Sequence, residues 1–327
     1  MLKPFAFVAA LGLSCTALAG PVRAPADPGL LALQSMDQRV AAIGHRLARA
    51  NLDICERRMP LSGLLVHAVD QYPASARPAV ISTFGLGDEP AVLVVVPGSA
   101  AARAGLQVGD GVVSLSGKAF PLKGSRKKAS YERVQEFEEF LIASLAAGPV
   151  AVEFLRGGMR HSAVLEPEPG CISRVQLVPS EKLNAAADGT YAQLTTGIVN
   201  FARGDDEIAL VVAHEMAHNI LGHRVRLNEQ KISRGLLKSL DGSAGKIRKT
   251  EVEADYLALY LLARAGFDIG VAPGFWQRYG PNALFEIFSE GTHPGRATRV
   301  SATRRTIEEI RMKQRQGAPL VPNLPAS

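Results

Sequence analysis

Two histidines and a glutamate stand close together in the run His214-Glu215-Met216-Ala217-His218. The apolar residues 208–212 lead directly into this run and predict a helix that continues through it. On a helix, His214 and His218 lie one turn apart on the same face, so two neutral imidazoles can bind one metal ion. Glu215 lies beside them and can take a proton from an attacking water. The alternative is a pair of packed core histidines beside a surface glutamate, but the motif favours metal-dependent hydrolysis.

A catalytic zinc site needs a third protein ligand and an open position for water. In one class of proteases a glycine and a third histidine follow seven and ten residues after the first histidine. Leu221 and Arg224 occupy those positions here, which excludes that class. His223 comes one residue too early, and helical geometry turns it away from the ligand face. We therefore expect His223 to be a structural residue or a group that supports a ligand.

A later helix, predicted to begin at Glu251 and to end at Gly266, offers a better third ligand. Glu251 and Asp255 share one face of this helix, one turn apart, whereas Glu253 points the other way. Glu251 would complete a His₂Glu site for one zinc ion per chain. Asp255 would orient one of the two histidines through its second ring nitrogen; ordinary solvent exposure is the alternative for this residue.

These residues resemble the HtpX-like and CAAX-prenyl-protease-like family of zinc metallopeptidases, peptidase family M48. Its signature pairs the first motif with Glu-x-x-x-Asp on a later helix. Asn184-Ala185, which opens a hairpin through residues 191–196, resembles the strand beside the family's cleft. Thr292-His293-Pro294 with Arg299 resembles the third block of the family. The resemblance covers about residues 170–311 and the helix before Cys55.

The resemblance implies a mainly helical, gluzincin-type metallopeptidase domain with a small β-hairpin or sheet. It also implies that His293 and Arg299 belong to the active site. There His293 would stabilise the oxyanion or cap the zinc in a resting state. The best-known members are integral membrane enzymes, but no segment of the mature chain approaches the roughly 18 apolar residues of a membrane span. The chain is therefore most similar to the soluble, periplasmic BepA-like type, with a PDZ-like domain in place of helical repeats.

The middle of the chain resembles a PDZ domain. The resemblance rests on residues 95–110, Val-Val-Pro-Gly-Ser-Ala-Ala-Ala-Arg-Ala-Gly-Leu-Gln-Val-Gly-Asp, and on the next strand at 112–118. In such domains a peptide adds as a strand to a sheet edge, and loop amides hold its terminal carboxylate. Phe84, Gly85 and Leu86, just before the strand at 91–96, resemble that carboxylate loop. The alternative is an unused groove in a domain that only spaces or shields the active site.

Shifts in composition predict an α+β protein with two domains. Apolar spacing predicts a helix from Leu30 to about Glu56, and a single helix at about 131–146 interrupts the β-rich middle. The predicted parts are a signal peptide (1–19), a linker and helix packing on the peptidase domain (20–61), a PDZ-like domain (62–168), the metallopeptidase domain (169–315) and a Pro-rich tail (316–327).

The N-terminus predicts export to the periplasm. Lys3, the apolar residues 5–13 and the small residues at 17 and 19 are typical of a signal peptide cleaved between Ala19 and Gly20. Lipid attachment at Cys15 is the weaker alternative. Cleavage leaves Cys55 and Cys171, and two cysteines in an oxidising compartment predict one disulfide; two buried thiols are the other possibility.

The chain carries 37 Lys and Arg against 31 Asp and Glu, a formal charge of +6 that is spread along its length. Because its densest basic cluster, residues 123–128, lacks interleaved aromatic residues, we expect no nucleic-acid partner. We expect an exported zinc endopeptidase that cleaves unfolded or mislocalised envelope proteins, assisted by a PDZ groove for C-terminal peptides. The alternative is a latent or non-enzymatic PDZ chaperone or scaffold, whose zinc would be structural if His293 were a permanent fourth ligand. Glu215 favours the enzyme, since a structural site needs no carboxylate there.

Overall fold

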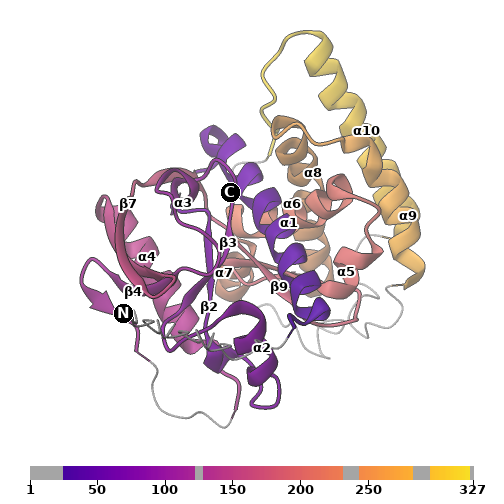
Figure 1. Ribbon diagram of the computed structural model, residues 1–327. Helices are drawn as coiled ribbons and strands as arrows, with labels where there is room; N and C mark the ends of the chain where they lie inside the picture. The colour runs from indigo at the N-terminus through magenta and orange to yellow at the C-terminus, as the bar shows by residue number, and fades with distance from the viewer. Residues whose placement is uncertain (1–24, 122–127, 231–242, 283–294, 325–327) are drawn as a thin grey trace, which may run out of the picture.

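The computed structural model describes residues 25–121, 128–230, 243–282 and 295–324. Figure 1 shows a β-rich part at the left and a mainly helical part at the right, which confirms the predicted α+β class. Among the described residues, no helix is both long enough and apolar enough to cross a lipid bilayer. The predicted signal peptide, Cys15 and His293 lie outside the described residues.

The β-rich part is built on a sheet with the strand order β2-β3-β4-β6-β7, with β5 paired to β4. Its elements are β2 (Leu64–His67), η2 (Val69–Gln71), α2 (Arg77–Phe84), β3 (Ala91–Val95), α3 (Ala100–Arg103), β4 (Gly111–Leu115), β5 (Lys118–Ala119), α4 (Glu132–Ala147), β6 (Val150–Arg156) and β7 (Met159–Leu165). Strand β6 shows why the sheet has one buried face, since Val150, Val152 and Phe154 are buried and the residues between them are exposed. Helix α4 buries Phe137, Leu141 and Leu145 in the same core.

Sequence patterns located most of this part but missed α2. The helix predicted at 131–146 is α4, displaced by one residue at each end. Helix α2 has only eight residues and starts with a proline in its first turn, so it offers too short an apolar pattern to detect. Gly85, whose φ is 68°, ends it in the left-handed conformation that glycine adopts without strain.

The helical part surrounds a second hydrophobic core and a three-stranded sheet with the order β10-β11-β9. Its elements are β9 (Arg174–Val178), β10 (Ala185–Ala187), β11 (Tyr191–Thr195), α5 (Thr196–Phe201), α6 (Asp205–Ile220), α7 (His223–Glu229), α8 (Ser243–Arg264), η4 (Ile269–Val271), α9 (Ala272–Asn282) and α10 (Arg296–Arg315). Helices α6 and α8 pack against each other, and α6 also packs on β10 and β11.

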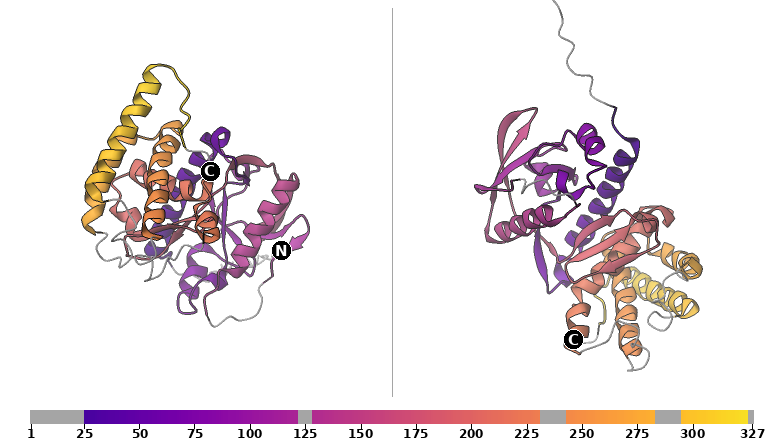
Figure 2. Two further views of the ribbon diagram at one scale, coloured as in Figure 1. Left: turned by 180° about the vertical axis from the view of Figure 1, so that it is seen from behind. Right: turned by 90° about the horizontal axis from the view of Figure 1, so that it is seen from below.

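Helix α1 (Pro28–Ala50) lies between the two parts, as the views in Figures 1 and 2 agree. Val40, Ile43 and Leu47 belong to the core of the helical part, whereas Ala41 packs with residues of β3. At Gly44 the helix touches β9 so closely that a Cβ atom would lie 2.2 Å from Val175 Cγ2. Glycine is therefore required for this contact.

The predicted first helix is too long at its C-terminal end. It stops at Ala50 because the Asn51 side chain donates to the Leu47 carbonyl and also to the Leu261 carbonyl of α8. A short 3₁₀ turn, η1 (Leu52–Ile54), follows. The prediction relied on apolar spacing within the segment, and this stop depends on a distant helix.

A disulfide between Cys55 and Cys171 closes a loop with a sequence separation of 116 residues. Beside it, β1 (Arg58–Leu61) pairs antiparallel with β8 (Glu168–Cys171). The disulfide and the β1–β8 strand pair bring together the chain segments that enter and leave the β-rich part. The predicted pairing of the two cysteines is present in the structure.

Candidate metal centre

Helix α6 places both histidines of the motif inside the helical part. Residues 208–213 are buried around the helix because α1, α8 and the sheet surround it. Three acidic residues, 205–207, occupy its first turn, where the helix dipole favours negative charge. One turn apart on this helix, His214 and His218 bring their Nε2 atoms to 3.3 Å from each other. Glu215, next to His214, is buried with 8% of its surface exposed.

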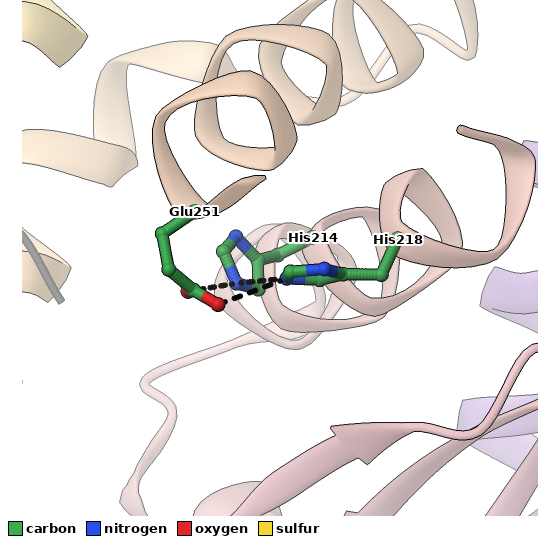
Figure 3. A group of neighbouring side chains, drawn as sticks. All are labelled: His214, His218 and Glu251. Atoms are coloured by element: carbon green, nitrogen blue, oxygen red, sulfur yellow. Dashed lines mark hydrogen bonds and ion pairs between the residues drawn. The ribbon is translucent and has the colours of Figure 1, made fainter. Parts of the chain in front are cut away.

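Glu251 reaches the histidines from α8. Its Oε2 lies 3.4 Å from His214 Nε2, and its Oε1 lies 3.5 Å from His218 Nε2. Figure 3 shows the three side chains pointing toward one another from two helices. A tetrahedral zinc ion at the usual bond lengths of about 2.0–2.2 Å would hold its ligand atoms about 3.3–3.5 Å apart. The spacing of these donors therefore fits one zinc ion.

Asp255 and Arg299 stand behind His214. Asp255 Oδ1 lies 3.0 Å from His214 Nδ1, and Arg299 donates two hydrogen bonds to the same carboxylate at 2.6 and 2.7 Å. Burial alone would raise the pKa of Asp255, but Arg299 and His214 lower it below its ordinary value. The ionised Asp255 accepts the Nδ1 proton, so the Nε2 lone pair of His214 points at the metal position.

A second network supports His218. His223 Nδ1 lies 2.8 Å from His218 Nδ1, and His223 Nε2 lies 3.1 Å from Glu253 Oε2, which also forms an ion pair with Arg226. Since an ionised Glu253 can only accept, His223 donates through Nε2 and must accept through Nδ1. His218 then donates through Nδ1 and presents its Nε2 lone pair to the metal position. His223 thus supports His218, as expected. Glu253 does not contact the metal position, but it orients His223 and so supports His218 indirectly.

The pKa values of His214 and His218 are shifted in opposite directions. Burial, the largest cause, lowers the pKa of His218 to about 3, which keeps its ring neutral. Burial also lowers the pKa of His214, but hydrogen bonds with Asp255 and Glu251 outweigh it and raise the pKa to about 10. The two carboxylates thus favour a positive charge at this position, which a bound metal ion would supply in place of the proton.

Trp276 completes the wall of the site and was missed by sequence reasoning. Its ring lies 3.3 Å from the guanidinium carbon of Arg299 and meets the ring of His214 edge-on at 5.9 Å between centroids. It comes from α9, which packs on both α6 and α10. A single tryptophan in a helix matches no catalytic motif. The only feature in the sequence that distinguishes this residue is that the chain contains one tryptophan.

The structure places the other predicted residues as follows. Arg299 is 8% exposed and lies at the candidate metal centre, and His293 falls outside the described residues.

Phe84 ends α2, and the strand after the 84–86 loop, β3, is paired on both sides, by β2 and by β4. A peptide cannot add to a strand whose two edges are already paired. Within the described residues, the sheet's open edge on this side is β2.

Asp255→Asn should lower zinc affinity by about 10–100-fold. An amide can donate to Nδ1 as well as accept from it, so it no longer fixes His214 in the tautomer that presents the Nε2 lone pair. Competition with a chromogenic chelator would measure this without reference to activity. Glu308→Gln removes the same charge from an exposed position on α10 and should leave the affinity unchanged. Equal affinity in the wild type and Asp255→Asn would show that Asp255 does not support the ligand.

Part of the chain is similar to known peptidases. Residues 161–239 match peptidase family M48, a segment that includes His214 and His218 and ends before Glu251. The mitochondrial metalloendopeptidase OMA1 of Arabidopsis thaliana is 30% identical over 142 residues, covering 37% of this chain and 29% of that protein. A putative beta-barrel assembly-enhancing protease of Vibrio cholerae is 28% identical over 131 residues, covering 31% of this chain and 27% of that protein. The chain thus spans less than a third of the length of either relative.

Two solved structures are similar to part of the chain. The HtrA3 PDZ domain bound to a phage-derived ligand is 20% identical with a TM-score of 0.26, covering 35% of this chain and 89% of that one. The HtrA-type protease AlgW with a decapeptide is 18% identical with a TM-score of 0.26, covering 34% of this chain and 30% of that one. The predicted resemblance to the metallopeptidases of family M48 is confirmed.

Proposed function

We propose that this protein is a zinc-dependent endopeptidase. The observation that carries the proposal is the convergence of His214, His218 and Glu251 at the spacing of zinc ligands, with Glu215 next to them on α6. Zinc held by these three residues would polarise the scissile carbonyl and lower the pKa of a water molecule.

The protein's own residues would then handle protons and orientation. Glu215 takes a proton from the attacking water and passes it to the leaving amine. Asp255 and His223 keep His214 and His218 in the tautomers that the site needs. Arg299 holds Asp255 in its ionised form. A role for His293 in stabilising the oxyanion, or in capping the zinc at rest, stays a prediction.

Strand β10 offers a place for an extended substrate beside the metal centre. It is an edge strand of the three-stranded sheet and packs against α6, which carries the two histidines. An extended polypeptide can pair with such an edge through its backbone. Binding of this kind is largely independent of side chains, which suits an enzyme acting on unfolded polypeptides.

We further propose that the enzyme is exported to the periplasm and cleaves unfolded or mislocalised envelope proteins, selected in part by the PDZ-like domain. The signal-peptide pattern at residues 1–19 and the Cys55–Cys171 disulfide support an oxidising compartment. The similarity to a putative beta-barrel assembly-enhancing protease agrees with an envelope role. The free edge of β2 is the described strand edge at which the PDZ-like domain could take a C-terminal peptide.

Metal analysis of Glu251→Ala tests the ligand set. Losing one of three protein ligands should reduce the zinc content after dialysis from about one ion per chain to nearly none, and cleavage of unfolded casein should fall with it. Glu229→Ala, which removes an exposed carboxylate on α7, should keep both. Full zinc content in Glu251→Ala would contradict the assignment.

A further inference from the structure

A cavity of about 590 Å³ lies between the two parts of the molecule, away from the metal centre. Its walls include the edge strand β2, the preceding strand β1, helices α1 and α4, and the edge strand β9 of the other sheet. Helix α1 separates the two sheets along this side, as the right-hand view of Figure 2 shows. A ligand in this cavity would contact both parts of the protein at once.

The walls of the cavity suit an extended, mainly apolar polypeptide. Leu65, Leu141 and Ile142 line one side, and Val175 and Leu177 line the opposite side. Strand β2 ends its sheet, so among the described residues its outer backbone groups have no partner strand. An added strand would satisfy these groups, and its apolar side chains would fill the cavity.

Two polar side chains of α1, His45 and Asp37, line the cavity. His45 has a buried Nε2 atom that makes no hydrogen bond within the described part of the chain, although Glu168 lies 3.7 Å away. Asp37 lies two turns earlier, near Tyr72. Eight residues of helix separate the two positions by about 12 Å, a length covered by roughly four residues of an extended chain.

Asp37 differs from the other carboxylate that lines the cavity. Glu138 accepts hydrogen bonds from Tyr131 and Tyr191 and lies 3.6 Å from Arg174. Asp37 has no hydrogen bond or ion pair with any described residue, and burial raises its pKa from 3.8 to about 7. A carboxylate held in an apolar wall without a counter-charge is stabilised by any ligand that brings a cation to it.

We propose that this cavity binds an extended polypeptide segment that adds as a strand to β2 and places a lysine or arginine side chain against Asp37. The proposal rests on the peptide-selecting role proposed above and specifies it. Selection would be for apolar segments that carry one basic residue. The selecting carboxylate belongs to α1, which packs on both parts of the molecule, and not to the sheet or helices of the PDZ-like domain.

Binding of matched peptides tests the proposal. The probes are fluorescent ten-residue peptides of β-branched residues with a single central lysine, or with glutamate in its place. Binding is measured by anisotropy on zinc-loaded Glu215→Gln protein, residues 20–327, so that no peptide is cleaved. We expect the lysine peptide to bind at least about tenfold more tightly than the glutamate peptide. Asp37→Asn should reduce this ratio to within about threefold, and Asp37→Lys should reverse it.

Controls separate this outcome from misfolding and from other sites. Glu166→Gln removes an exposed carboxylate outside the cavity and should preserve the full ratio. Asp37→Asn should unfold at pH 8 at a temperature no lower than the wild type, because it removes a half-buried charge that has no ion-pair partner among the described residues. Bound peptide should slow amide exchange in residues 64–67, but not in residues 83–86.

Three results would overturn the proposal: equal binding of the two peptides, a ratio that survives Asp37→Asn, or no binding of either peptide. Amide protection at residues 83–86 in place of 64–67 would also overturn it. Casein cleavage by the wild type is measured separately. Cleavage without peptide binding would refute only the proposed peptide site in this cavity. Peptide binding without cleavage would refute only the proposed peptidase activity.

Discussion

Glu215→Gln should reduce kcat/KM for unfolded casein by at least about 100-fold while the protein keeps its zinc. The glutamine is nearly the same size, but it cannot accept the proton of the attacking water or deliver it to the leaving amine. Zinc content should not change, because His214, His218 and Glu251 supply the ligands and Glu215 does not belong to that group.

The measurement pairs initial rates of casein cleavage with metal analysis on the same samples. Glu229→Gln, an exposed carboxylate on α7, serves as the matched control and should retain full activity. If Glu215→Gln cleaves as fast as the wild type, then Glu215 is not the base. If it loses zinc as well as activity, the variant has disturbed the site and the comparison must use Glu215→Asp.

Replacing both Cys55 and Cys171 by alanine should lower the free energy of unfolding by roughly 4–5 kcal/mol. The bridge closes a loop with a separation of 116 residues, and the chain-entropy treatment of such a loop gives this magnitude. For a protein of this size, that loss corresponds to a fall in Tm of about 6–8 °C. The bridged segment contains the whole β-rich part, so its removal acts on the unfolded ensemble of that entire segment.

Thermal unfolding with and without a reductant distinguishes this effect from simple repacking. Reductant should lower the Tm of the wild type toward that of the double variant and should leave the double variant unchanged. Two free thiols per mature chain under denaturing, non-reducing conditions, together with equal Tm values, would show that the bridge does not form.

The proposed metal ligands could be identified from the sequence because the required information is local. Spacing of four residues on one helix decides that His214 and His218 share a face, and the same rule pairs Glu251 with Asp255. Which of the two histidines Asp255 orients stayed open, because that depends on how α8 docks against α6. The structure shows that it is His214.

The supporting residues could not be predicted because they meet only through tertiary packing. Glu253 sits on the face of α8 that a helical wheel assigns away from the ligands, yet it contacts His223 at the start of α7. Trp276 reaches Arg299 from a third helix. No spacing rule connects segments whose relative positions are set by the core they share.

The strand edge at which a peptide could bind could not be predicted either. The residues before a strand can resemble a carboxylate loop, as Phe84, Gly85 and Leu86 do, but only the order of strands decides whether that strand has a free edge. Strand order depends on long-range pairing, here of β2 and β4 with β3. The same long-range packing brings α1 and Asp37 beside β2, which no pattern within residues 28–50 indicates.

The central claim is that zinc held by His214, His218 and Glu251 makes this protein a peptidase. The most direct test is to remove the metal from residues 20–327 with a chelator, add zinc back in steps, and follow the cleavage of unfolded casein. We expect no cleavage in the metal-free protein and full recovery at one zinc ion per chain. Cleavage that persists without metal, or zinc binding at one ion per chain with no cleavage at any point of the titration, would contradict the account, and the second result would favour a binding scaffold with a structural zinc site.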